Sequence, residues 1–534
     1  MTAPVAPVVA PYRSPQPAGR DGFAQLVHAE WTKLRTVRGW LIGLFLVIVV
    51  TDLLGIFGGG YSHAVCITGP GAKPQTGAAC TPKIPTGPGG EAVHDTYYLV
   101  GQVLAGNGTL TARVTSLATE HGIPSGPQGQ NTSLRPAPVA WAKSGIIITA
   151  STRPGAAYAA MMVTQGHGVR MQYDYTGDTA GRPGAASAAS PRWLRLTRAG
   201  DTVTGYDSAD GVHWATVGTV RLPGLASTVR AGLFAAAPDW EQSTTNFGGG
   251  ENGQGGPSLA TATLDRISAS GGWATGRWQG TAVGGPDLAQ VGYQQGGGRF
   301  TVRGSGDIAP MVPGAGGREQ TIEQHLIGVF AGLIVVIMVA VLFITVEYRR
   351  GLIRTTLTAS PRRGRVLAAK ALVIGTVTFV AGLIAAVIAV IGGVAVVHSQ
   401  FGYVYPVTGL TWVRVVAGSA LLLAVAAVLA VAVGSILRRT AAAVTVGVVV
   451  LVLPYILGVA AILPGGAAQW VLRITPAAAF AIQQSIPAYP QVDNLYLPTT
   501  GYYPLAPWAG FAVLCGWTAL AFGLAVVLIR RRDA

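Results

Sequence analysis

The chain has 534 residues and a formal net charge of +15, and its mean hydropathy is positive at +0.44. Only 11% of the residues are charged, whereas about 25% are charged in an average soluble domain. So few charges cannot cover the surface of a fully soluble protein of this size. The 74 glycines and 33 prolines follow no Gly-X-Y period, which excludes collagen. A basic excess is typical of a nucleic-acid-binding protein or of a membrane protein with its charges on one side, and the position of the charges decides between them.

Six apolar runs are each long enough, at about 20 residues, to cross a bilayer as a helix. They cover residues 40–58, 326–346, 371–398, 413–436, 441–463 and 508–529. The first run is long, begins well inside the chain and lacks a small-residue cleavage site, so we interpret it as a retained anchor and not as a signal peptide. The sequence therefore predicts a polytopic α-helical membrane protein with six transmembrane helices in the lipid bilayer.

The basic residues accumulate on one side of these predicted spans. The segments on that side are 1–39, 347–370, 437–440 and 530–534, and together they hold 17 basic and four acidic residues. The block 59–323 on the other side holds 18 basic and 16 acidic residues. Because basic residues in short loops stay in the cytoplasm, both termini are predicted to be cytoplasmic and residues 59–323 extracellular. The excess is spread over four stretches and forms no single basic face, so no nucleic-acid partner is predicted.

The extracellular block is predicted to begin with a linker, residues 59–95, that is rich in Gly, Pro and Thr and carries Cys66 and Cys80. In an oxidising compartment these two cysteines would form a disulfide, worth about 3 kcal/mol in the chain-entropy model. Two free thiols in a flexible linker are the alternative. Cys515 lies in the last predicted span and is interpreted as a packing residue.

Residues 96–310 show short alternating segments separated by Gly, Pro, Asn and Asp, which is typical of an all-β sandwich or barrel. The segments are TLTARVTSL, GIIITAS, AYAAMMVTQ, GVRMQYDY, RWLRLTRAG, DTVTGYDS, HWATVGTV, VRAGLFAA, ATLDRIS and RFTVRGS. We therefore expect an inserted all-β domain between the first two spans.

The residues of this domain do not favour a catalytic site or a metal site. It has no closely spaced carboxylates on a single strand of the kind that a glycosidase needs. Asp207 and Asp210 could bind calcium, but turn-forming residues of a hairpin are the stronger interpretation. His167 and His213 lack a second His or Cys nearby, so no metal is assigned.

Five tryptophans could provide a stacking surface for a sugar: Trp141, Trp193, Trp214, Trp273 and Trp278. Core packing across strands is the stronger interpretation for Trp193 and Trp214. Trp273 and Trp278 lie in a Gly-rich segment and are the better candidates for glycan contact.

Part of this domain resembles a known fold. The run PRWLRLTRAGDTVTGYDSADGVHWATVGTV, together with WAKSGIIITAS and PGAAYAAMMVTQGHGVRMQYDY, is similar to the concanavalin A-like lectin/glucanase sandwich found on bacterial glycosidases. The resemblance covers residues 96–270. It implies a two-sheet jelly roll and contact with an extracellular glycan.

One basic segment precedes the first span, and a second connects spans two and three. Residues 23–38 place Phe23, Leu26, Val27, Trp31 and Leu34 at helical spacing with basic residues on the other face, which predicts an interfacial elbow helix or an ordinary juxtamembrane anchor. Residues 347–370, EYRRGLIRTTLTASPRRGRVLAAK, place a Ser-Pro breaker between two helical stretches.

These segments resemble the membrane (permease) subunit of an ABC-2 type ABC transporter. The likeness covers residues 23–58 and 324–534, and LRRTAAAV and the outer gate loop 464–507 also fit it. The resemblance implies that the elbow helix and the coupling loop 347–370 dock an ATP-binding subunit, and that re-entrant helices in loop 464–507 close an extracellular gate. The coupling residues it implies are Trp31, Lys33, Arg35, Glu347, Arg349, Arg350, Gly351, Arg354, Thr355, Pro361 and Arg363. A loop that only sets orientation is the alternative.

The sequence contains no G-x-x-x-x-G-K-[ST] stretch. The chain is therefore expected to bind no cofactor directly and to be no enzyme, with ATP on a separate partner subunit and a second permease copy beside it. Our interpretation is the permease subunit of an ATP-driven exporter with an unidentified cargo. A membrane-anchored glycan-binding receptor or sensor is the alternative. The large insert departs from the short first loop of typical members and leaves the cargo open.

The predicted division of the chain is 1–58, 59–95, 96–310 and 311–534. The first part holds the cytoplasmic tail, the elbow helix and the first span, and the last part holds spans two to six. Asp52 is the one acid inside a predicted span, and such an acid is a functional candidate, although a solvated residue at the membrane interface is as good an interpretation.

Overall fold

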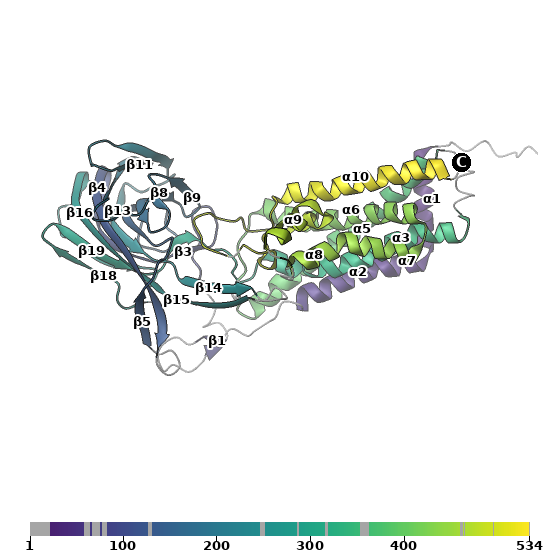
Figure 1. Ribbon diagram of the computed structural model, residues 1–534, viewed down its shortest axis with the longest axis horizontal. Coiled ribbons are helices and arrows are strands. Elements are labelled where there is room, and N and C mark those ends of the chain that lie inside the picture. The colour runs from purple at the N-terminus through teal and green to yellow at the C-terminus, as the bar shows by residue number, and fades with distance from the viewer. Residues whose placement is uncertain are drawn as a thin grey trace, which may run out of the picture.

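A computed structural model describes residues 22–57, 65–66, 75–76, 83–125, 131–245, 251–285, 288–314, 319–352, 362–459, 463, 465–494 and 496–532. The molecule is elongated, with a β-domain at one end and a helical bundle at the other (Figure 1). The β-domain lies between the first and second long helices in the sequence. We call the far end of the bundle, where α1 lies, the basic end, and the end nearest the β-domain the sandwich end (Figure 1).

Within the described residues, six helices are long and apolar enough to cross a membrane, which confirms the six predicted spans. They are α2 (Arg38–Phe57), η3 (Ile322–Leu326) with α3 (Gly328–Arg349), α5 (Arg363–Ser399), α6 (Gly409–Leu437), α7 (Thr440–Leu451) with α8 (Leu453–Val459), and α10 (Pro507–Arg532). The shorter elements are α1 (Phe23–Thr36), α9 (Gly465–Ile474), η4 (Pro476–Gln483) and η5 (Pro498–Thr500). The break between α7 and α8 puts Pro454 in the first turn of α8, where a missing backbone N–H costs no hydrogen bond.

The helices pack through small residues. The core of the bundle includes Ala386, Ala426, Ala427 and Ala430, all fully buried, and short side chains let helix backbones approach closely inside a membrane. Large apolar side chains cover the outside instead, with more than half of the surface of Ile42, Phe45, Ile391 and Leu520 exposed. A soluble bundle would bury these residues, whereas lipid accepts them.

The β-domain is antiparallel and confirms the expected all-β insert. Its strands are β1 (Val65–Cys66), β2 (Gln75–Thr76), β3 (Val93–Asp95), β4 (Tyr97–Ser125), β5 (Asn131–Pro136), β6 (Lys143–Thr149), β7 (Tyr158–Thr164), β8 (Gly168–Tyr173), β9 (Gly177–Ala180), β10 (Arg192–Ala199), β11 (Thr202–Ser208), β12 (Ala215–Arg221), β13 (Thr228–Ala236), β14 (Trp240–Thr245), β15 (Glu251–Gly256), β16 (Ser258–Trp273), β17 (Gln279–Val283), β18 (Gly292–Gly296), β19 (Arg299–Gly304) and β20 (Ile308–Pro310).

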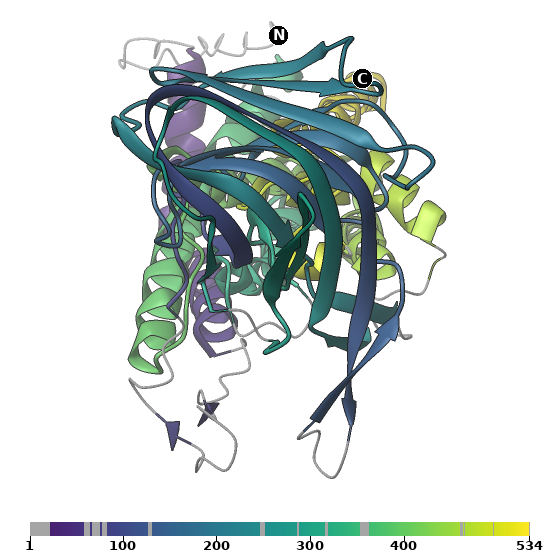
Figure 2. The same ribbon diagram turned by 90° about the vertical axis from the view of Figure 1, so that its left-hand side faces the viewer.

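The main sheet runs in the order β12-β11-β10-β4-β13-β6-β7-β8-β9, and β4 also pairs with β5, β16 and β17. The sheet curls strongly (Figure 2), so that β12 approaches β8: a Cβ added at Gly218 would meet the Met171 sulfur at 3.0 Å. The enclosed core contains Met161, Met171, Leu194 and Leu196. Strand β10 alternates buried and half-buried residues, as a strand with one face in the core must.

The β-domain is bonded to the loops at the sandwich end. The buried Gln491 side chain donates hydrogen bonds from Nε2 to the carbonyls of Tyr175 and Thr176 at 3.1 and 3.3 Å. Asn494 donates to the Pro313 carbonyl at 2.9 Å, and the Tyr405 hydroxyl donates to the Val312 carbonyl at 3.1 Å. The β-domain is therefore held to the α5–α6 and α9–α10 loops by side-chain contacts as well as by its own two connections.

Candidate coupling site at the basic end of the bundle

The face of α1 that packs against the bundle contains a buried carboxylate. Glu30 and Leu34 are buried, whereas Trp31 is 43% exposed and Phe23 is 39% exposed. The spacing of the apolar residues predicted the helix correctly. The buried face, however, carries a carboxylate one turn before Leu34, and that carboxylate needs partners.

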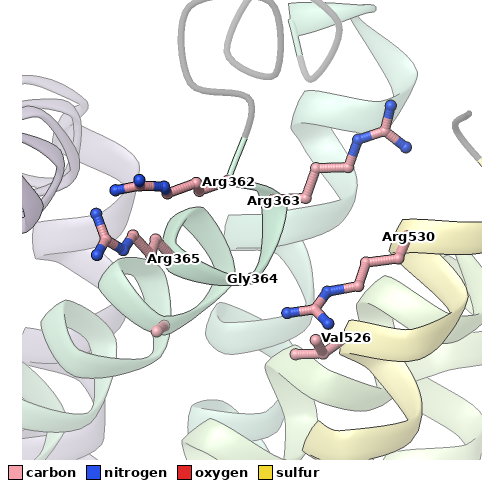
Figure 3. Close-up of a pocket in the computed structure, with 7 residues that line it drawn as sticks. Arg362, Arg363, Gly364, Arg365, Val526 and Arg530 are labelled. Carbon is pink, nitrogen blue, oxygen red and sulfur yellow. The ribbon is translucent and has the colours of Figure 1, made fainter. Parts of the chain in front are cut away.

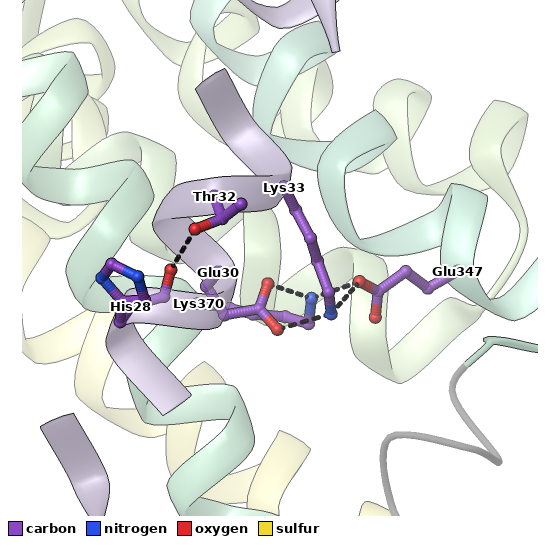
Figure 4. Close-up of polar contacts among 6 residues, drawn as sticks. All are labelled: His28, Glu30, Thr32, Lys33, Glu347 and Lys370. Atoms are coloured by element: carbon purple, nitrogen blue, oxygen red, sulfur yellow. Dashed lines mark hydrogen bonds and ion pairs between the residues drawn. The ribbon is translucent and has the colours of Figure 1, made fainter. Parts of the chain in front are cut away.

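Those partners form the charge cluster, which consists of Glu30, Lys33, Glu347 and Lys370 (Figure 4). Lys370 Nζ lies 2.6 Å from Glu30 Oε2 and 2.6 Å from Glu347 Oε1. Lys33 Nζ reaches the same two carboxylates at 2.8 and 3.1 Å. The cluster joins three segments, because its members come from α1, from the last turn of α3 and from the second turn of α5.

The charge cluster is balanced and mostly dry. Lys370 is fully buried, and Glu30 and Glu347 are 2% and 7% exposed. The Lys370 ammonium also lies 5.0 Å from the centroid of the Phe343 ring. Removing one member of such a group leaves an uncompensated buried charge, which costs about 3–5 kcal/mol. The cluster therefore fixes the position of α1 on α3 and α5.

Ten of the eleven sequence-predicted coupling residues fall into three groups. Lys33 and Glu347 are internal to the charge cluster. Trp31, Arg35, Arg349, Arg350 and Gly351 are exposed around it. Arg354, Thr355 and Pro361 lie outside the described residues.

The remaining predicted coupling residue, Arg363, begins α5 and donates from Nη1 to the Ile529 carbonyl at 3.2 Å. Arg349 ends α3 and Arg350 is its C-cap residue, and Gly351 follows with a φ of +70°, a left-handed conformation that glycine adopts without strain. The exposed predicted residues thus surround the point where the chain leaves α3.

Sequence reasoning missed Glu30 and Lys370 as site residues. Glu30 was recognisable in principle, because an acid stands at helical spacing among the apolar residues of the elbow helix. Lys370 was counted only as one of seven basic residues in the loop between spans two and three, and nothing local marks it as buried.

A second feature of the basic end is a cavity of about 690 Å³ between the start of α5 and the end of α10 (Figure 3). We call it the arginine pocket, after Arg362, Arg363, Arg365 and Arg530 in its lining. Gly364, Ala368 and Val526 complete that lining.

The tryptophans predicted to pack in the core of the β-domain do not do so. Trp193 and Trp214 are half-buried on the face opposite Leu194, and each contacts a guanidinium: Arg113 lies 5.5 Å from the Trp193 ring centroid and Arg195 lies 3.8 Å from that of Trp214. The strand alternation explains the difference, because Leu194 and Leu196 take the core side of β10 and leave Trp193 outside.

The candidates for glycan contact, Trp273 and Trp278, are half-buried neighbours with ring centroids 6.1 Å apart. Trp273 also donates from Nε1 to the Thr109 carbonyl at 3.2 Å. Trp141 is buried and stacks on His167 at 3.9 Å. Of the five tryptophans, only Trp141 is fully inside the domain.

The acids considered for calcium act in local structure. Asp210 accepts hydrogen bonds from the backbone of Val212 and His213 in the β11–β12 turn, and Asp207 accepts one from the Arg182 N–H at 2.8 Å. No group of three or more His, Cys, Asp or Glu side chains suited to a metal occurs in the part of the chain that the structure describes.

Of four other residues singled out from the sequence, three lie within the described part of the chain. Cys66 lies in β1, but Cys80 is outside the described residues, so their disulfide stays a prediction. Asp52 lies in α2, and its Oδ1 is buried without a hydrogen-bond partner among the described residues. Cys515 is half-buried in α10, where it is a free thiol.

Six spanning helices with a β-sandwich between the first two define a polytopic membrane protein with one large inserted domain. The model of the ABC-2 family transporter proteins matches residues 26–534, so this chain belongs to the ABC-2 transporter family. That family supplies the membrane protein of a transporter. Its match confirms the resemblance found in the elbow helix and the coupling loop.

Comparisons with single proteins add little. No curated protein matches the chain. Among solved structures, a functionally unknown protein from Saccharomyces cerevisiae is 15% identical, with a TM-score of 0.21, and the match covers 36% of this chain and 82% of that one. Scytalido-glutamic peptidase with a transition state analog inhibitor is 10% identical, with a TM-score of 0.24, over 40% of this chain and 100% of that one. The GH43 BlXynB protein from Bacillus licheniformis is 17% identical, with a TM-score of 0.16, over 24% of each chain. Scores this low carry no functional argument.

Proposed function

We propose that this chain is the permease subunit of an ATP-driven exporter. ATP binds to a separate partner subunit, a second copy of the chain completes the transmembrane pathway, and an unidentified cargo moves outward between the two copies. Family membership supports the permease role. The direction of transport, the partners and the cargo belong to the proposal.

The charge cluster is the observation that carries this function. A partner that pushes on the segment between α3 and α5 moves two spans at once, and Lys370 links both of them to Glu30 of α1. Because buried, mutually paired charges resist separation, the three segments move as one body. Such a rigid unit can deliver a nucleotide-driven motion to the spans as a hinge or shear movement.

The docking surface in this proposal is basic. Arg35, Arg349 and Arg350 are exposed beside the charge cluster, and within the described residues none of them has a carboxylate within 4 Å. An acidic surface on the ATP-binding subunit would complement them and speed its association. In this arrangement the basic end faces the cytoplasm and the β-sandwich is extracellular, which agrees with the distribution of basic residues.

Charge reversal tests the docking surface. In the double variant Arg349→Glu/Arg350→Glu, we expect co-purification of the ATP-binding subunit to fall at least tenfold, because two attractive contacts become repulsive. The matched control is Arg439→Glu/Arg531→Glu, which reverses two exposed charges elsewhere on the same end. Equal recovery of the ATP-binding subunit with both double variants would contradict the docking assignment.

A glycan-binding receptor is the second candidate. The adjacent, half-exposed rings of Trp273 and Trp278 favour it, because such rings can stack on the apolar face of a sugar. A glycan array probed with the full chain in detergent tests this role. Binding that is lost in Trp278→Ala would support it, and the absence of binding to every polysaccharide on the array would count against it.

A further inference from the structure

The arginine pocket gathers positive charge without a visible counter-charge. Arg362, Arg365 and Arg530 have no carboxylate within 4 Å in the part of the chain that the structure describes. Among the described residues, the one hydrogen-bond partner of the Arg363 side chain is the Ile529 carbonyl. Arg530 reaches across the gap toward Gly364 (Figure 3), where a Cβ on Gly364 would lie 3.6 Å from its Nη2.

The backbone adds to this positive potential. The 37-residue helix α5 begins at Arg363, and no side chain caps its N-terminus. The free N–H groups of a first helical turn carry a partial positive charge and attract anions. Four guanidinium groups and a helix N-terminus repel one another unless an anion lies among them. Guanidinium forks match the oxygens of a phosphate in a bidentate manner.

An apolar track leaves the pocket in the direction of the membrane. Gly364 and Ala368 line the pocket on α5, and from them a row of exposed residues at four-residue spacing continues through Leu372, Thr376, Val380 and Ile384. Such a row winds slowly around the helix as it runs along the axis. On α10, Leu520, Leu524 and Val527 are exposed in the turns before Arg530. A soluble anion would need no such track, and a folded protein surface would not follow a lipid-facing helix into the membrane.

We propose that the arginine pocket binds the phosphate group of an anionic phospholipid, with an acyl chain along the exposed face of α5. The lipid comes from the leaflet at the basic end. It offsets the positive charge of the pocket and fixes the start of α5 against the end of α10. This site does not depend on the proposed export function, since it uses neither the charge cluster nor the residues Arg349 and Arg350.

Native mass spectrometry of the full chain in detergent tests the proposal directly. The probes are phosphatidylglycerol, which is anionic, and phosphatidylcholine, which is zwitterionic, with inorganic phosphate as a competitor. We expect the chain to retain phosphatidylglycerol and not phosphatidylcholine. In Arg365→Gln/Arg530→Gln we expect at least a tenfold loss of phosphatidylglycerol affinity. Gly364→Leu, which fills the pocket without removing a charge, should lose as much.

Arg531→Gln is the matched control, since Arg531 is exposed at the same helix end but does not line the pocket. It should bind phosphatidylglycerol like the unchanged chain. An equal loss in Arg531→Gln would overturn the proposal in favour of diffuse charge attraction. Displacement of the lipid by inorganic phosphate would overturn it in favour of a free-anion site. Unchanged lipid binding in the pocket variants, with a weaker hold on the ATP-binding subunit, would overturn it in favour of a protein contact.

Discussion

Lys370 is the residue on which the basic end depends most. It is a fully buried lysine in α5, and its ammonium bonds to one carboxylate from α1 and one from α3. Its sequence separation from Glu30 is 340 residues, so the contact exists only once the β-domain has folded or at least been looped out between them. This single side chain therefore joins α1, α3 and α5 at the basic end.

A double-mutant cycle measures how strongly the charge cluster is coupled. Lys370→Met alone leaves two buried carboxylates against Lys33, so we expect it to lower the free energy of unfolding by about 3–5 kcal/mol. Adding Glu347→Gln restores charge balance through the Glu30–Lys33 pair. The double variant should therefore be more stable than the sum of the single effects by about 1–3 kcal/mol. Denaturant titration of the full chain in mixed micelles gives these values, and strict additivity would contradict the cluster.

Asp95 should make the β-domain less stable as the pH rises. It is buried in β3, where it accepts hydrogen bonds from the Tyr175 hydroxyl and the Gly155 N–H, each at 2.8 Å. Burial raises the pKa of Asp95 from 3.8 to about 6, against the opposing effect of these hydrogen bonds. Because the folded state holds the proton more tightly, this contribution to stability is complete below pH 4 and is lost as the pH rises through 6.

The Asp95→Asn variant should remove that pH dependence, since an amide oxygen can accept the same two hydrogen bonds without a charge. The difference in stability between the variant and the unchanged chain should grow by up to about 3 kcal/mol from pH 4 to pH 7. Melting temperatures of both chains across this pH range provide the measurement. If the melting temperatures of the two chains differ by the same amount at every pH, Asp95 does not titrate as described.

At the scale of elements, the loop between α9 and α10 is one of the segments that bond the helical bundle to the β-domain. Gln491 in this loop bonds to two successive carbonyls of the Asp174–Thr176 turn, where Asp174 and Tyr175 have positive φ values of 42° and 61°. Non-glycine residues adopt such a conformation only where surrounding contacts hold it. The loop and the strained turn therefore support each other.

Removing the Gln491 amide should lower the local stability of both the α9–α10 loop and the Asp174–Thr176 turn. In Gln491→Ala, we expect the backbone of residues 484–494 and of the Asp174–Thr176 turn to exchange amide hydrogens faster, by an amount corresponding to about 1–3 kcal/mol. Hydrogen–deuterium exchange of the full chain measures this effect. Gln295→Ala, at an exposed position of β18, is the control and should leave both segments unchanged. If the two variants exchange alike, the loop is not held by this contact.

The sequence predicted most elements because their periodicity is local. Each of the ten alternating segments overlaps a strand, and each apolar run overlaps one of the six candidate spans in the described part of the chain. The length of β4 could not be predicted from local alternation. Only 109–117 alternated visibly, but the strand covers 29 residues, since β5, β10, β13, β16 and β17 all pair with it. Pairing between distant segments, and not local pattern, decides that length.

The candidate site was only partly predictable for the same reason. Arg349 and Arg350 follow directly from the basic segment after span two, and the structure leaves them exposed there. Glu347 was assigned to the same surface, but the structure buries it against Lys370, a contact that no spacing in the sequence reveals. The burial of Glu30 depends in turn on how α1 lies against α3 and α5.

At the scale of the whole molecule, the chain connects two ends. The basic end carries the charge cluster, the exposed arginines and the arginine pocket, and the sandwich end ties a large β-domain to the loops between spans (Figure 1). The spans between them pack through alanine, valine and leucine and present large apolar side chains to lipid. A movement imposed at one end can reach the other only through these packed helices.

The hydrolysis of ATP by the proposed partner subunit, measured with this chain in lipid vesicles, tests the account most directly. Lys370→Met/Glu347→Gln keeps the charges balanced but removes the ion pairs that link α1 to α3 and α5. We predict that this variant still binds the ATP-binding subunit and fails to change its ATPase rate, whereas the unchanged chain changes that rate. A variant that alters the ATPase rate as fully as the unchanged chain would contradict the claim that the charge cluster couples ATP hydrolysis to the membrane helices.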